Sequence, residues 1–332
     1  MRVKVWLGVI LSAGLLALVI YFVKPAEVIS ALRAVNPYYL PPIVLMPIVL
    51  LGIRTLRWRY LMEPVKKDVP VGSLFSATVI GFMANNVLPL RLGELARAYA
   101  LGRRERLSKG AVFTTIVVER LFDGAAVLLL FAYTLAYLPP SVARAGVVAS
   151  IHKAGRASFG LFIVVVLALV YFVRRPEKLT GLTRKVTSLV APRFADKAVH
   201  MAESLVKSLG VVKDVRLLAL IAGLTALHWG LAWTPVYLLF KAFGLHYGIY
   251  PSVYLLVVMS FSVALPSTPG YVGTFHAAVT GGLMLLGLDA GPAFSYALVA
   301  HATNVIPVTL LGFYYLYREN LSLKGLKKAE QV

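Results

Sequence analysis

Apolar stretches long enough to cross a membrane recur along the chain, and they constrain its fold more than any other feature. A transmembrane helix needs about 20 consecutive, mostly apolar residues. Soluble domains do not repeat such runs, and about 25% of their residues are charged, whereas only 14% of these 332 residues are charged. We therefore expect an all-α integral membrane protein, a polytopic helix bundle.

The apolar runs extend over most of the chain, and we expect them to form a single transmembrane domain, residues 1–332. The first run is too long for the apolar core of a secretory signal, so we expect it to be a retained helix. Proline inside the second run predicts a kink at Pro47. The expected spans are 5–23, 38–55, 110–138, 157–173, 217–240, 250–266, 272–288 and 292–317, with a shorter apolar element at 73–89.

Basic residues greatly outnumber acidic ones, 34 against 14. Such an excess can indicate nucleic-acid binding, but here the basic residues lie between apolar runs, and we expect no nucleic-acid partner. Cytoplasmic loops of membrane proteins are rich in Lys and Arg. This rule predicts a multi-pass plasma-membrane protein with both termini in the cytoplasm. It assigns the basic residues from Arg54 to Lys67 to a cytoplasmic loop that follows the second span.

Two of the apolar segments are interrupted at a Leu-Pro pair, Leu88-Pro89 and Leu265-Pro266. Basic residues follow the first break, so the element at 73–89 is expected to turn back as a re-entrant segment rather than cross. Two interrupted segments in matching positions are typical of transporters built from inverted repeats. Ordinary proline kinks in a bundle are the alternative interpretation.

Acidic residues within or beside apolar segments are expensive in a membrane and often functional. Glu94 lies three residues from both Arg91 and Arg97, and Glu119 lies four residues from Asp123 on one helical face. These groups could hold a lipid phosphate through the arginines, or they could form an internal salt-bridge network. The predicted substrate-binding residues are Arg91, Glu94, Arg97, Glu119, Arg120, Asp123, Thr274 and His276.

The second half offers histidine and amide groups instead of acids. His301 and Asn304 lie three residues apart on one expected helix, and a histidine there could couple transport to protons. Hydrogen bonding between helices is the alternative role. We expect His228, Trp229 and Trp233 to be packing residues.

The basic segment 174–216 carries apolar residues at helical spacing. Helices lying in the inner surface of the membrane would show this pattern. A solvated cytoplasmic helical hairpin would show it equally well.

The sequence motifs of common enzymes are absent, including GxxxxGK[ST], HExxH and GxSxG. Cysteine is absent as well, which excludes disulfides and cysteine chemistry. We predict no cofactor and no metal, and membrane lipids as the partners.

Three segments resemble the transmembrane, flippase-like domain family of lysylphosphatidylglycerol synthases: NVLPLRLGELAR at 86–97, ERLFD at 119–123, and PSTPGYVG at 266–273. The resemblance covers nearly the whole chain and implies lipid translocation. It also implies motif roles for the charged residues of the first two segments. Larger members add a soluble synthase domain, and we expect a stand-alone member without it. Where the family often has Glu in the second half, this chain has His276.

The leading hypothesis is therefore a flippase for an anionic or zwitterionic phospholipid, or for a polyprenyl-phosphate-linked lipid. Some members of the resembled family are linked to polyprenyl- or dolichyl-linked sugars. The alternatives are a membrane-embedded transferase acting on a lipid-linked substrate, and a scaffold subunit that transports nothing.

Overall fold

The computed structural model describes residues 24–88, 92–137, 174–190, 195–265 and 267–328, with isolated positions between 10 and 21, between 157 and 172, and at 192. These residues form helices and turns, and no strand occurs among them, so the predicted all-α class is confirmed. The predicted spans 5–23 and 157–173 lie largely outside the described residues, and Arg91 lies outside them entirely.

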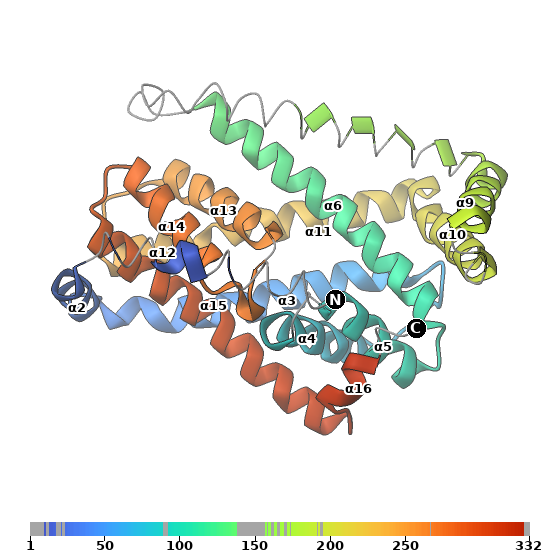
Figure 1. Ribbon diagram of the computed structural model, residues 1–332, viewed down its shortest axis with the longest axis horizontal. Helices are drawn as coiled ribbons and strands as arrows, with labels where there is room; N and C mark the ends of the chain where they lie inside the picture. Colours follow the sequence, from blue (N-terminus) through green and yellow to red (C-terminus); the bar gives the residue numbers. More distant parts are fainter. Residues whose placement is uncertain are drawn as a thin grey trace.

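Long helices extend along the greatest dimension of the molecule (Figure 1). Within the part of the chain that the structure describes, three stretches are long and apolar enough to cross a membrane, at 37–62, 215–242 and 290–318. α6 has 28 residues, but its apolar part contains three charged residues, Glu119, Arg120 and Asp123. The helices are η1 (Pro37–Tyr39), α3 (Leu40–Met62), α6 (Lys109–Ala136), α11 (Val215–Ala232), α12 (Thr234–Ala242) and α15 (Ala290–Arg318).

Two helical hairpins pack against these helices, and the first helix of each ends at a leucine that precedes proline in the sequence. The first hairpin consists of α4 (Val71–Val87) and α5 (Gly93–Glu105). The second consists of α13 (Ile249–Ala264), η5 (Pro269–Tyr271) and α14 (Thr274–Leu285). Leu88 and Leu265 end α4 and α13 in extended conformation, because a residue that precedes proline is disfavoured in the helical region.

Glycine allows α4 and α5 to pack closely. Gly93 lies beside Asn85, whose side-chain oxygen accepts a 2.8 Å hydrogen bond from the Gly93 N–H. Gly81, which precedes Asn85 on α4, lies beside Arg97, which follows Gly93 on α5. The two helices are therefore antiparallel. A Cβ on Gly81 would lie 2.8 Å from the Gly93 carbonyl oxygen, which leaves no room for a side chain.

α15 forms hydrogen bonds with the tips of both hairpins. The Asn86 side chain, at the first tip, donates a 2.9 Å hydrogen bond to the Thr309 hydroxyl. His301 Nε2 donates a 2.6 Å hydrogen bond to the carbonyl oxygen of Gly270, at the second tip. The tips also meet, since a Cβ on Gly270 would lie 3.2 Å from the Asn86 carbonyl oxygen. Gly270 has a φ of 70°, which favours glycine.

Two large apolar cores surround the hairpins among the described residues, and a small third core consists of Leu51, Val79 and Val308. One lies among α3, α4, α5 and α6 and includes Trp58, Leu74 and Leu101, all 0% exposed. The other lies among α12, α13, α14 and α15 and includes Phe240, Leu255 and Tyr296, also 0% exposed. Each hairpin therefore has a core of its own.

Shorter helices lie at the two ends of the bundle (Figure 1). α2 (Pro25–Arg33) is at one end. α9 (Pro176–Val190) and α10 (Ala195–Leu209) lie across the other end, where α16 (Leu323–Lys328) and the end of α5 are also found. η4 (Gly210–Lys213) joins α10 to α11.

The second span was predicted to end at residue 55 in a basic cytoplasmic cluster that begins at Arg54. The predicted end is wrong, because α3 continues to Met62 and buries the side chains of Arg54 and Arg57. The helix continues because buried carboxylates on α6 neutralise these arginines, as described below.

Replacement of Gly81 by alanine should destabilise the protein, because the new methyl group overlaps the α5 backbone. We expect a loss of about 1–3 kcal/mol, the usual cost of overpacking. The measurement is thermal unfolding in detergent. Gly72→Ala, on the same helix with nothing within 4 Å of its Cβ position, is the matched control. Equal stability of the two variants would contradict the close packing of α4 on α5.

Candidate functional site

α3 presents two arginines and a tryptophan on one face. Arg54, Arg57 and Trp58 are three and four residues apart, which places them along one side of the helix. All three side chains are buried. Arg54 and Arg57 need buried partners, because removing a charge from water costs several kcal/mol.

α6 supplies these partners through Glu119 and Asp123. Arg54 Nη1 lies 2.8 Å from Glu119 Oε1 and 2.6 Å from Asp123 Oδ2. Arg57 Nη2 lies 3.3 Å from Glu119 Oε1 and 2.8 Å from Asp123 Oδ1. Each arginine therefore contacts both carboxylates. Arg57 also donates to the Thr225 hydroxyl of α11 at 3.1 Å.

α5 adds a third buried arginine, Arg97. Its Nη1 lies 2.9 Å from Glu119 Oε2, and its guanidinium carbon lies 3.6 Å from the centre of the Trp58 ring. The Glu119 contact lacks hydrogen-bond geometry: Arg97 Nε, Nη1 and Nη2 are buried without an acceptor among the described residues, and Glu119 Oε2 is buried without a donor. The Trp58 ring contacts the Arg97 guanidinium through a cation–π interaction. The N–H groups of Arg97 donate no hydrogen bond to a described residue.

We call Arg54, Arg57, Arg97, Glu119 and Asp123 the buried ion cluster. Each side chain is at most 8% exposed. Three guanidinium groups face two carboxylates, so the cluster carries one positive charge in excess among the described residues. An uncompensated buried charge is costly, and an anion would neutralise it.

Glu94 and Arg120 form the rim of this cluster. Arg120 Nη2 lies 3.1 Å from Glu94 Oε1, with the two side chains 39% and 27% exposed. Arg120 Nη1 also lies 3.4 Å from Asp123 Oδ2. The local spacing pointed to a Glu94–Arg97 pair, but Glu94 pairs with Arg120 instead, while Arg97 faces Glu119.

α11 completes the site with His228 and Trp229. His228 Nδ1 lies 3.2 Å from the Leu50 carbonyl oxygen, so Nδ1 donates and Nε2 accepts from Arg54 Nη2 at 3.2 Å. Trp229 Nε1 donates to Asp123 Oδ1 at 3.2 Å. Both residues were predicted to pack, and their rings do contact each other in the interior, but both also hydrogen-bond to the buried ion cluster.

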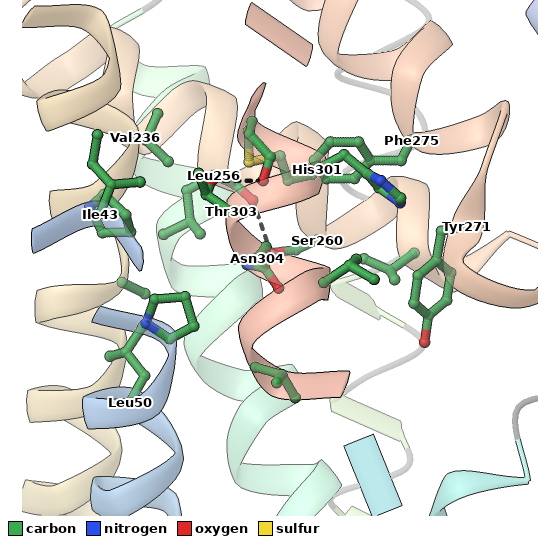
Figure 2. Close-up of a pocket in the computed structure, with 18 of the residues that line it drawn as sticks. Ile43, Leu50, Val236, Leu256, Ser260, Tyr271, Phe275, His301, Thr303 and Asn304 are labelled. Carbon is green, nitrogen blue, oxygen red and sulfur yellow. Dashed lines mark hydrogen bonds between the residues drawn. The ribbon is translucent and has the colours of Figure 1, made fainter. Parts of the chain in front are cut away.

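A cavity of about 310 Å³ lies beside the cluster. His228 and Trp229 line the cavity and also hydrogen-bond to the cluster. Asn85 of the first hairpin lines it as well. Most of its wall is apolar, as Figure 2 shows for Ile43, Leu50, Val236 and Leu256. The cavity therefore combines an apolar wall with a polar side next to excess positive charge.

The second hairpin and α15 form the other wall. Tyr271, Phe275, His301 and Asn304 line the cavity (Figure 2). The sequence predicted His301 and Asn304 on one helix, and both lie on α15 at this wall. α3, α4, α11, α12 and α13 contribute the remaining lining residues.

Thr274 and His276 are buried at the start of α14 and are not among the residues that line the cavity. The Thr274 hydroxyl donates to the Tyr271 carbonyl oxygen at 3.3 Å. His276 Nδ1 accepts from the Gly273 N–H at 3.4 Å, and its ring centre lies 4.7 Å from that of His301. These two residues fix the backbone of the second tip.

The described residues contain no group of three or more His, Asp or Glu side chains that could hold a metal ion. The chemistry available at this site is ionic contact and hydrogen bonding from arginine, histidine and amide groups. Such groups suit an oxyanion, and guanidinium groups in particular match phosphate.

Comparison with known proteins identifies the family. The model of the lysylphosphatidylglycerol synthase transmembrane region matches residues 5–312. The chain belongs to this family. A UPF0104 membrane protein of Methanothermobacter thermautotrophicus is 26% identical over 80% of this chain and 80% of its own length. A second UPF0104 membrane protein of that organism is 24% identical over 91% and 90%.

A shorter match relates the chain to the glycosyltransferase AglD of Haloferax volcanii. The two are 30% identical over 122 residues, which cover 37% of this chain and 20% of that protein. No solved structure matches the chain significantly. The family thus agrees with the resemblance carried by the motifs, and the two UPF0104 relatives are named membrane proteins.

Replacement of Glu119 by glutamine should strongly destabilise the protein, since three buried arginines would then face one carboxylate. Breaking a buried ion pair typically costs about 3–5 kcal/mol. Glu94→Gln is the matched control, because its pair with Arg120 is partly exposed and worth about 1 kcal/mol or less. Apparent melting temperatures of the two purified variants test this. A Glu119→Gln variant as stable as Glu94→Gln would show that the buried ion cluster does not support the fold.

Proposed function

We propose that the protein is a lipid flippase, which moves a phospholipid or a polyprenyl-phosphate-linked lipid across the plasma membrane. The observation that carries this proposal is the excess positive charge of the buried ion cluster. A phosphate group would neutralise it and accept the hydrogen bonds that Arg97 leaves unused. Zwitterionic phospholipids carry the same phosphate, so they remain candidate substrates.

The cavity suits the rest of such a lipid. Its wall is mostly apolar, and its polar side adjoins Arg54 through His228. Irregular backbone at membrane depth is tolerated where it is buried in protein or lines a cavity. The two hairpin tips meet each other beside the cavity described above. We infer that the hairpins form a re-entrant inverted repeat and that a head group passes between their tips.

The remaining predicted residues have roles in this proposal. Arg120 and Glu94 lie at the partly exposed rim, where they would receive the head group before it reaches Arg97. Arg91, which lies outside the described residues, is proposed as a further head-group ligand. His301 and Asn304 line the opposite wall, where they would contact the head group or couple its passage to protons. Thr274 and His276 would keep the second tip in position for binding.

The orientation proposed for the protein places both termini in the cytoplasm. Basic residues gather where α3, α5 and α15 end: Lys66 pairs with Glu105 at 2.8 Å, and Arg104 pairs with Glu319. Positively charged ends favour the cytoplasmic side.

A membrane-embedded transferase is the second candidate, because AglD is named a glycosyltransferase and shares 122 aligned residues with this chain. It predicts transfer of a group to a lipid-linked acceptor by purified protein in detergent, with a donor supplied. A flippase predicts movement of lipid between leaflets and no new covalent product. Assaying both activities on one preparation distinguishes them.

Arg97→Gln should separate transport from stability. Two arginines and two carboxylates would remain in the cluster, so the variant should fold normally, losing about 0.5–2 kcal/mol through the Trp58 contact. Its rate of lipid movement in proteoliposomes should fall by about tenfold or more, equivalent to at least about 1.4 kcal/mol. The measurement is dithionite quenching of a fluorescent phospholipid.

Arg103→Gln is the matched control, since Arg103 lies on the same helix and is exposed. It should transport at the wild-type rate. A folded Arg97→Gln variant that moves lipid as fast as Arg103→Gln would overturn the assignment of Arg97 as the phosphate-binding group.

A further inference from the structure

α9 and α10 differ in how they bury their apolar residues. α10 is attached to α6: Val199 and Ala202 are 8% exposed, Leu209 is 4% exposed, and Ser208 Oγ lies 2.8 Å from Thr114 Oγ1. α9 contacts α10, yet it leaves three large apolar side chains outside. The outer helix therefore carries an apolar surface that no described part of this chain covers.

These three side chains form a stripe along α9. Leu182, Val186 and Leu189 are 51%, 49% and 78% exposed and lie at positions i, i+4 and i+7. Residues at this spacing share one face of a helix. A helix solvated on its outer side would carry polar residues there, so water is not the expected surrounding of this stripe.

Lysine residues border the stripe. Lys178 lies four residues before Leu182, and Lys185 lies four residues before Leu189, so each is the helical neighbour of an apolar residue. Arg174 and Arg175 precede the helix. Segment 174–190 contains five basic residues and one acidic residue, Glu177, a net charge of +4. This charge is complementary to an anionic lipid surface.

The position of α9 in the chain and in the fold agrees with that surface. Described residues shortly before it are apolar and exposed, including Val164, Leu167 and Tyr171 at 62%, 62% and 51%, as expected for a segment in contact with lipid tails. α9 then lies across the end of the bundle that also carries the ends of α5 and α16 (Figure 1). Amphipathic helices at membrane surfaces occupy such positions.

We propose that α9 lies in the head-group layer of the membrane, with Leu182, Val186 and Leu189 inserted at the acyl boundary and Lys178 and Lys185 bound to phosphates of anionic phospholipids. Long lysine side chains can place their stems along the apolar boundary and their charges in the head-group layer. Of the two interpretations of segment 174–216, the exposed stripe favours the interfacial helix over the solvated hairpin. The inference does not depend on lipid transport.

Site-directed spin labelling tests it on the full chain, because the protein has no cysteine and each introduced cysteine is unique. Leu182→Cys, Val186→Cys and Leu189→Cys would be labelled in nanodiscs that contain an anionic phospholipid. We expect higher accessibility to oxygen than to a water-soluble nickel complex at these positions. Gly181→Cys and Ser188→Cys, exposed on another side of α9, should show the reverse.

The lysines are tested by repeating the Val186→Cys measurement with Lys178→Gln and Lys185→Gln, and in nanodiscs of zwitterionic lipid alone. Both changes should shift the label toward water. Equal water accessibility of the stripe and of Ser188→Cys would overturn the proposal and leave the stripe for a protein partner. Unchanged depth after loss of both lysines would overturn the anionic-lipid part of it.

Discussion

The pairing of buried charges on α3 and α6 is the interaction on which the rest of the structure depends. Arg54 and Arg57 each contact Glu119 and Asp123, and neither pair of groups could be buried without the other. This requirement fixes how α3 and α6 face each other. Arg97 of α5 joins the same carboxylates, with its Nη1 2.9 Å from Glu119 Oε2, so the first hairpin packs against the paired helices.

The hairpins extend this arrangement to the second half of the chain. Each turn interrupts a helix, and α15 binds both tips: Thr309 accepts a hydrogen bond from Asn86, and His301 donates one to the Gly270 carbonyl oxygen. The cavity lies where the hairpins, α15 and the buried ion cluster come together. One excess positive charge next to an apolar cavity is an arrangement that matches a lipid with a phosphate head group.

Local patterns predicted the all-α class, because apolar runs act within a few residues. They predicted Glu119 and Asp123 on one face for the same reason. They did not predict the partners, since Arg54 lies 65 residues from Glu119, and no local spacing records such a contact. Arg54 and Arg57 also match the excess of basic residues expected on the cytoplasmic side of a membrane protein. Their role in a buried site was therefore not recognised from the sequence. The sequence did contain a sign of this site. Arg54, Arg57 and Trp58 are spaced to share one face of a helix, and the acidic pair Glu119 and Asp123 on another apolar segment could neutralise the two arginines.

The central claim is that Arg97 binds the phosphate of a lipid. An electron cryo-microscopy structure of the protein in nanodiscs of its native lipids tests this most directly. We predict head-group density within hydrogen-bond distance of the Arg97 guanidinium, about 2.7–2.9 Å for charged partners, continuous with a lipid tail in the cavity. A well-resolved Arg97 that contacts only Glu119 and Trp58, beside a cavity without lipid density, would contradict it.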